Sequence, residues 1–167
     1  MPSAKTSLFS GLFLGEYDHA LDASVSLPSD WRSRDGETEL VMIPARGKAL
    51  VLLPVATFLE FVEKAKKLAI ANPKMQMAFA YLGSRSRQCR CDKQGRIALD
   101  RRMLDEIGVK GQLKLIGALT HIRLTAPENW TVPNDEESLN MYLDEIQKVS
   151  DDNSDIAGLL GGIFGKA

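Results

Sequence analysis

The chain has 167 residues, of which 44% are hydrophobic and 26% charged, and its formal net charge is −1. This composition is typical of a folded protein and excludes a chain that is disordered throughout. The near-zero net charge excludes uniform attraction to a polyanion, so any nucleic-acid surface must come from local segregation of charge. The length allows one ordinary domain, or two small units that need each other to complete a core.

The N-terminal residues give no sign of export or anchoring. The chain contains no stretch that approaches the roughly 18 apolar residues of a membrane span, and its N-terminus lacks a long apolar signal segment. We therefore expect a cytoplasmic protein without a membrane partner. Residues 1–11 have no hydrophobic periodicity and predict a mobile leader.

The first half of the chain predicts a β-rich unit followed by helices. Residues 17–27 show short apolar alternation broken by polar residues, which fits a strand, a turn and a second strand or helix start. The apolar runs 40–43 and 49–53 predict a hairpin. Helical spacing from residue 56 predicts a helix that Pro73 closes, and a second helix is expected over residues 74–81, ending at Gly83.

The second half repeats this order. Residues 89–99 predict strand, turn and strand, and Asp100 is a suitable N-cap for a short helix that Gly108 ends. Residues 113–116 and 121–124 predict another hairpin, followed by an amphipathic segment from Pro127 to Val149. The halves align with an offset of roughly 70 residues, placing Leu21-Asp22 with Cys91-Asp92, Leu40 with Leu113 and Leu50 with Ile122.

Positive charge is concentrated in one segment, in Arg85, Arg87, Arg90, Lys93, Arg96, Arg101 and Arg102, against only Asp92 and Asp100. If the predicted strand extends back to Arg85, strand alternation places Arg85 and Arg87 on one face. Such a row either follows DNA phosphates or forms a solvated edge that discourages sheet aggregation. The first half offers a similar row in Arg32, Arg34, Arg46 and Lys48.

The sequence offers little support for an enzyme or a metal site. The spacing of Cys89 and Cys91 differs from that of zinc fingers, and His19 and His121 lie in different halves. The two cysteines share one face of a predicted strand and are poorly placed for a mutual disulfide. Since no catalytic triad order or phosphate-binding glycine loop is present either, we expect no catalytic residues, no metal and no cofactor.

Several short blocks resemble the two signature blocks of the MraZ family, namely Gly15-Glu16-Tyr17, Leu21-Asp22, Ser26-Leu27-Pro28 and Cys91-Asp92-Lys93-Gln94-Gly95-Arg96. Members of this family carry two SpoVT/AbrB-like units, each marked by an Asp-x-x-x-Arg motif. The resemblance implies an α+β fold of tandem swapped-hairpin β units related by a pseudo-two-fold, with flanking helices. It predicts a first unit over residues 12–72 and a second over 82–149. The glycine-rich composition of residues 150–167 predicts a flexible tail.

The resemblance also implies a function and a location. It predicts a nucleoid-associated regulator of transcription that forms ring-like homo-oligomers and binds repeated DNA sites upstream of division and cell-wall genes. The first motif departs from the family pattern, because Asp22-Ala23-Ser24 stands where members have Asp-x-Lys-Gly-Arg. A second hypothesis is therefore a degenerate paralogue that keeps the fold and the oligomer but acts as an interaction or scaffold protein, with a protein partner bound through residues 151–167.

The intact motif has two readings that the sequence leaves open. Asp92 can hold the backbone or the guanidinium of Arg96 while Gly95 supplies a positive φ, which is a structural use. Alternatively, Arg96 and Lys93 reach phosphates or guanine edges. The candidate DNA contacts are Arg96, Lys93, Arg90, Arg87, Arg85, Arg32 and Arg34, and the candidate structural residues of the motifs are Asp92, Gly95 and Asp22.

Overall fold

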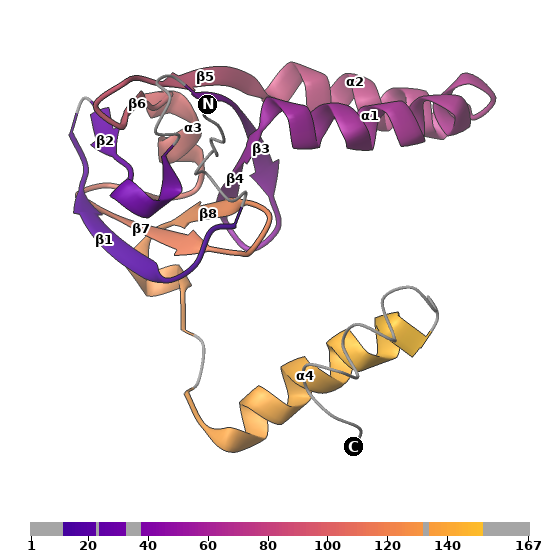
Figure 1. Cartoon of the computed structure of the whole chain (residues 1–167). Helices are drawn as coiled ribbons and strands as arrows, with labels where there is room; N and C mark the ends of the chain where they lie inside the picture. The colour runs from indigo at the N-terminus through magenta and orange to yellow at the C-terminus, as the bar shows by residue number, and fades with distance from the viewer. Residues whose placement is uncertain (1–11, 23, 33–37, 132–133, 152–167) are drawn as a thin grey trace, which may run out of the picture. The chain divides into compact units, whose positions relative to one another are not determined.

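The computed structural model describes residues 12–22, 24–32, 38–131 and 134–151 (Figure 1). The chain divides into two compact units, Met1–Trp130 and Thr131–Ala167, and each is described by itself. The expected mobile leader, Arg34 and the glycine-rich tail from residue 152 onwards lie outside the described residues.

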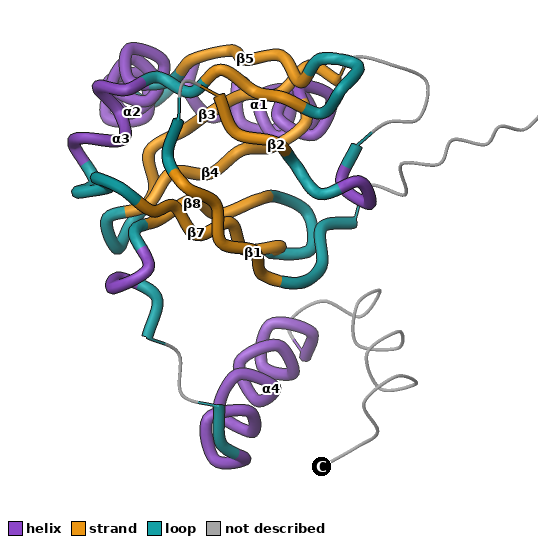
Figure 2. The backbone as a smooth tube through the Cα atoms, turned by 90° about the vertical axis from the view of Figure 1, so that its left-hand side faces the viewer, coloured by secondary structure: helices purple, strands orange, loops and turns teal. Residues whose placement is uncertain are grey.

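Eight antiparallel strands in the first unit form one sheet that almost closes on itself (Figure 2). The strands are β1 (Glu16–Ala20), β2 (Ser24–Ser26), β3 (Thr38–Ala45), β4 (Ala49–Pro54), β5 (Arg87–Cys91), β6 (Arg96–Ala98), β7 (Gln112–Gly117) and β8 (Ile122–Thr125). Their order in the sheet is β1-β7-β8-β4-β3-β5-β6-β2. Both ends of this order, β1 and β2, come from the first half of the chain.

The two halves of the sequence share their strands. β1 pairs with β7, β3 with β5, β2 with β6 and β4 with β8, so each strand has a partner from the other half. A two-fold operation that exchanges β1 with β5, β2 with β6, β3 with β7 and β4 with β8 maps these four pairs onto one another. The predicted α+β fold of tandem swapped-hairpin units is therefore confirmed.

Alternating residues of the strands fill the interior of the sheet. Both hairpins contribute fully buried side chains, listed by strand as Leu40, Met42, Leu50, Leu52, Leu113, Leu115, Ile122 and Leu124. Trp31 closes one end, where its ring packs edge-on against Phe13 at 5.9 Å between centroids and its indole N–H donates to the Leu14 carbonyl at 3.0 Å. Since burying one such side chain contributes about 1.5–3 kcal/mol, this shared interior is the main source of stability.

Local signals explain the short elements between the strands. Asp100 caps α3 (Arg101–Glu106), because its Oδ1 accepts from the backbone N–H groups of Arg102 and Met103 at 2.9 and 3.4 Å. Gly108 follows the helix with φ +81°, as predicted for a residue that ends it. In the first half, the equivalent place holds a single 3-10 turn, η2 (Ser29–Trp31).

A helical hairpin, α1 (Val55–Ile70) and α2 (Pro73–Arg85), extends from the sheet (Figure 1). Asn72 caps α2 through its side-chain oxygen, which accepts from the N–H groups of Lys74 and Met75. The prediction that Gly83 ends this helix is wrong. Glycine inside a helix costs only about 1 kcal/mol, and the hydroxyls of Ser84 and Ser86 donate to the carbonyls of Tyr81 and Leu82, which supports the last turn.

The greater length of α2 changes the position of one candidate residue. Arg85 belongs to the last turn of α2, whereas Arg87 begins β5. The strand therefore does not extend back to Arg85, and the two arginines do not share a strand face.

The amphipathic segment that was predicted to open at Pro127 is divided. A 3-10 turn, η3 (Pro127–Asn129), ends the first unit, and α4 (Glu136–Asp151) belongs to the second. Asp135 sets the start of α4, because its Oδ1 accepts from the Ser138 N–H at 2.8 Å. Across the described ranges, none of the helices combines the length and the apolar character needed to cross a membrane.

Candidate nucleic-acid interface

The loop Asp92–Arg96 joins β5 to β6 and is held closed by one carboxylate. Asp92 Oδ1 accepts from the backbone N–H groups of Gln94 and Arg96 at 2.8 and 2.9 Å, and the Asp92 N–H donates to the Arg96 carbonyl at 2.9 Å. Gly95 adopts φ +83°, a conformation that favours glycine. The hydrogen bond from the Arg96 backbone is the main cause that lowers the pKa of Asp92, so the carboxylate stays ionised near neutral pH.

The charged side chains of this loop face solvent. Arg96 Nε donates to Asp92 Oδ2 at 3.2 Å, and about half of the Arg96 side chain, 53%, is exposed. Lys93 is exposed at the tip of the loop. The loop thus combines a fixed backbone with an arginine and a lysine that are accessible from outside.

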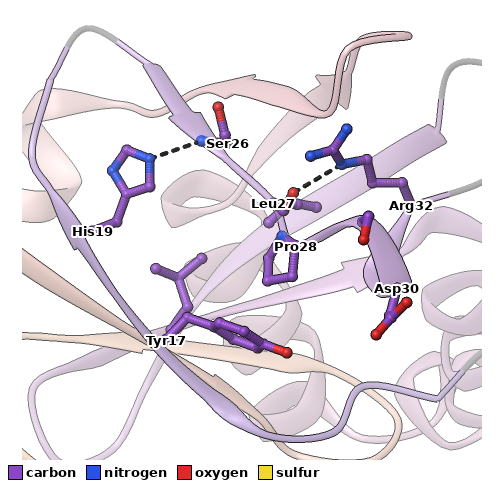
Figure 3. A pocket seen from close by; sticks show the side chains of 9 residues that line it. Tyr17, His19, Ser26, Leu27, Pro28, Asp30 and Arg32 are labelled. Carbon is purple, nitrogen blue, oxygen red and sulfur yellow. Dashed lines mark hydrogen bonds between the residues drawn. The ribbon is translucent and has the colours of Figure 1, made fainter.

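Arg32 reaches this loop from the other half of the chain. The Leu27 N–H donates to the Gly95 carbonyl at 2.8 Å, and Arg32 Nε donates to the Leu27 carbonyl at 2.8 Å (Figure 3). A Cβ atom on Gly95 would overlap Nε, Cδ and Cζ of Arg32. Arg32, predicted as a DNA contact, is therefore half-buried and lies against Gly95 of the loop.

The corresponding place in the first half lies between β1 and β2 and is described except at Ala23. In the β2–β6 ladder, Ser26 pairs with Arg96 and Ser24 with Ala98, so the two-fold operation puts Ser24 in the position of Arg96. Asp22 follows β1, and Ala23, the next residue, lies outside the described residues. The first half therefore presents a serine where the second presents its arginine.

A histidine side chain bridges β1 and β2 instead. His19 Nε2 accepts from the Ser26 N–H at 3.2 Å, and Nδ1 lies 2.7 Å from the Ala20 carbonyl, which places the ring hydrogen on Nδ1. Beside this bridge lies an open pocket of about 420 Å³, lined in part by Tyr17, Pro28, Asp30 and Arg32 (Figure 3). Both ring nitrogens of His19 are thus engaged within the protein.

The arginines before the loop are each balanced by a carboxylate. Arg90 Nε lies 2.7 Å from Glu39 Oε1, which also lowers the pKa of Glu39 after the larger effect of a hydrogen bond from Gln88. The other two pairs are Arg87 with Asp100 at 3.4 Å and Arg85 with Glu106 at 3.8 Å. Exposed ion pairs of this kind contribute at most about 1 kcal/mol, so a phosphate can replace the carboxylate at low cost.

One further arginine belongs with this group. Arg102 on α3 lines a pocket of about 190 Å³ together with Arg85 and Arg87. Arg102 lies in the basic segment of the sequence, but only the packing of α3 beside the end of α2 brings it to these two side chains. Sequence spacing alone gives no signal for that contact.

The thiols of the two cysteines have low reactivity. Burial is the main cause that raises the pKa of Cys89 to about 12, and burial also raises the pKa of Cys91. Within the described part of the chain, no three His, Cys, Asp or Glu side chains gather as a metal site requires. The basic loop and its neighbouring arginines are the features of this unit that suit a nucleic-acid partner.

The swapped sheet and its Asp-x-x-x-Arg loop define a protein of the tandem SpoVT/AbrB-like class. The chain is 30% identical over 145 residues to the transcriptional regulator MraZ of Dictyoglomus turgidum, covering 84% of this chain and 97% of that protein. The chain belongs to the MraZ family.

Other relatives agree with this assignment. The transcriptional regulator MraZ of Lachnoclostridium phytofermentans is 30% identical over 121 residues, which cover 71% of this chain and 84% of the relative. That of Clostridium acetobutylicum is 27% identical over 132 residues, which cover 78% and 92%. No family model matches the sequence.

Proposed function

We propose that this chain is a DNA-binding regulator of transcription of the MraZ type that acts on repeated sites upstream of division and cell-wall genes. The observation that carries the proposal is the Asp92–Arg96 loop, in which a carboxylate fixes the backbone and Arg96 remains accessible. The three relatives named above are all transcriptional regulators, which supports the same function and gives no support to an enzyme.

The loop has the chemistry of a DNA contact. Arg96 donates to Asp92 through Nε. The hydrogen bonds described for Arg96 include none from its two terminal nitrogens. These nitrogens can form a bidentate pair with guanine or bind a phosphate. Lys93 adds a second positive charge at the tip. Arg90, Arg87, Arg85 and Arg102 are proposed as phosphate contacts, whereas Arg32 is proposed to position the loop through Gly95.

A single loop per chain predicts weak binding by one copy. We propose that a ring-like homo-oligomer presents several loops at once, so that weak contacts add through avidity on repeated DNA sites. The two repeats, over residues 12–72 and 82–149, supply the shared scaffold, and the protein acts at the nucleoid in the cytoplasm.

The test is fluorescence anisotropy with DNA from the promoter of the division and cell-wall cluster, against a scrambled duplex. We expect Arg96→Ala to weaken specific binding about tenfold or more, as for a lost bidentate contact. Arg96→Lys is the matched control for charge, and it should retain binding to scrambled DNA while losing the preference for the promoter. An absence of binding at low salt, or specific binding that survives Arg96→Ala, would refute the proposal.

The second candidate function is a scaffold protein without specific DNA binding, and one observation favours it. Ser24 occupies the position of the first arginine, so half of the usual contacts are missing. A protein partner that is lost on deleting residues 151–167, together with intact assembly and no preference for promoter DNA, would support this alternative.

A further inference from the structure

The helical hairpin exposes apolar side chains that the other described residues of its unit leave open to solvent. Leu68 and Ile70 on α1 are 63% and 76% exposed, and Met77 and Tyr81 on α2 are 70% and 61% exposed. Several large apolar side chains exposed on one element can mark an interaction site. These exposed side chains of the hairpin are thus available to contact a partner.

A groove runs between the two helices near the sheet. It has a volume of about 190 Å³ and is lined by Phe58, Phe61, Val62, Phe79, Leu82 and Gly83. The rings of Phe58, Phe61 and Phe79 form one wall, with centroids 6.2 and 6.5 Å apart in succession. Gly83 has no side chain to fill the space, and a Cβ there would touch nothing within 4 Å. An apolar side chain of a partner fits this groove.

The charge of the hairpin indicates the charge of that partner. The two helices carry Lys64, Lys66, Lys67, Lys74 and Arg85 against Glu60 and Glu63, a formal charge of +3. An apolar groove between basic helices is suited to an amphipathic helix with acidic flanks.

The chain itself contains such a helix. On α4, the apolar residues Leu139, Tyr142, Leu143, Ile146 and Val149 recur at helical spacing on one face. Of these, Leu139 and Val149 are 56% and 60% exposed. Residues 136–150 carry Glu136, Glu137, Asp144 and Glu145 against Lys148, a formal charge of −3. The apolar face and the charge of α4 are complementary to those of the hairpin.

We propose that α4 of one copy binds the α1–α2 groove of a second copy. A second copy is the chosen occupant because this contact would join the chains of the proposed ring-like homo-oligomer, through the opposite charges of α4 and the hairpin.

This contact is heterologous, because the donor surface and the acceptor surface are different parts of the molecule. A repeated heterologous contact closes into a ring when its rotation closes, and otherwise continues as an open filament. The inference rests on the assembly part of the proposed function and names its interface. It is independent of whether the Asp92–Arg96 loop binds DNA.

The test reverses charges in the full-length chain. The mass of the assembly is measured by size-exclusion chromatography with light scattering. One variant carries Lys64→Glu and Lys66→Glu beside the groove, and the other carries Glu136→Lys and Glu145→Lys beside the apolar face of α4. We expect each variant alone to lose the oligomer. Their equimolar mixture should restore it, because each acidic hairpin then meets a basic α4 from the other variant.

The matched controls are Lys67→Glu and Glu137→Lys, which lie on the opposite faces of their helices and should leave the oligomer unchanged. Circular dichroism checks that each variant keeps its helices. A wild-type monomer, single variants that assemble normally, or a mixture that stays dissociated would overturn the inference. A wild-type oligomer that binds promoter DNA and ignores these reversals would overturn this interface alone and leave the DNA-binding proposal standing.

Discussion

Replacing Gly95 by alanine should destabilise the first unit by two separable effects. Gly95 has φ +83°, and a residue with a Cβ pays about 1–2 kcal/mol in the left-handed region. The new Cβ would also overlap Arg32, whose Nε donates to the Leu27 carbonyl at 2.8 Å. Displacing Arg32 forfeits that hydrogen bond, which contributes about 1 kcal/mol. We expect a total loss of about 2–3 kcal/mol in the free energy of unfolding.

A second glycine provides the control for the backbone effect. Gly108 has φ +81°, but a Cβ there would meet nothing within 4 Å. Gly108→Ala should therefore cost only about 1–2 kcal/mol. The difference between the two alanine variants measures the overlap with Arg32.

A double-mutant cycle isolates the same contact. Arg32→Ala alone should cost about 1 kcal/mol, and Gly95→Ala introduced into that variant should cost no more than Gly108→Ala does. The assay is urea unfolding at a fixed protein concentration, followed by the combined fluorescence of Trp31, which is buried, and Trp130. Equal costs at Gly95 and Gly108, or strictly additive effects of Gly95→Ala and Arg32→Ala, would refute the reasoning.

Three other predictions concern single groups. Asn72→Ala removes the cap of α2 and should cost about 1 kcal/mol in urea unfolding, whereas alanine in place of the exposed Lys74, whose side chain takes no part in the cap, should cost clearly less. Cys89 and Cys91 should resist alkylation by iodoacetamide at pH 8 in the folded protein and react on unfolding, because burial raises both thiol pKa values, that of Cys89 to about 12; fast labelling of the native chain would contradict this. Since the folded pKa of Asp92 lies below its usual 3.8, its contribution to stability is present above that value and is lost as the pH falls through the lowered pKa. The stability difference between wild type and Asp92→Asn should therefore shrink below about pH 4, and a constant difference down to pH 2 would argue against the prediction.

Features that depend on neighbouring residues could be predicted from the sequence. The helix between Asp100 and Gly108 is set by a cap and a stop within nine residues, and the strand pairs follow from short apolar runs. The offset between the halves, together with the family resemblance, was enough to anticipate the exchange of strands. The loop Asp92–Arg96 closes through bonds that span four residues, so its two possible uses were visible in advance.

Features that depend on register between distant segments could not be predicted. Glu39 meets Arg90 only because β3 pairs with β5 in a particular register. Arg32 lies against Gly95 because the Leu27 N–H donates to the Gly95 carbonyl, a contact between residues 68 apart that the sequence does not indicate. The end of α2 was misjudged because two serine hydroxyls support the last turn, a contribution that a glycine-based stop signal ignores.

The exchange of strands between the halves has a consequence during synthesis of the chain. The hairpin of β3 and β4 and the pair of helices that follows it involve nearby residues, so they can form as soon as they emerge. β1 and β2 must wait for β7 and β6, and β4 cannot find β8 until Thr125 has been made, 71 residues after Pro54. At the usual pace of translation this delay lasts roughly 4 to 14 seconds. During that interval the nascent chain has unpaired strand edges. Nascent chains on neighbouring ribosomes of one messenger RNA can then pair these edges with one another instead of within one chain.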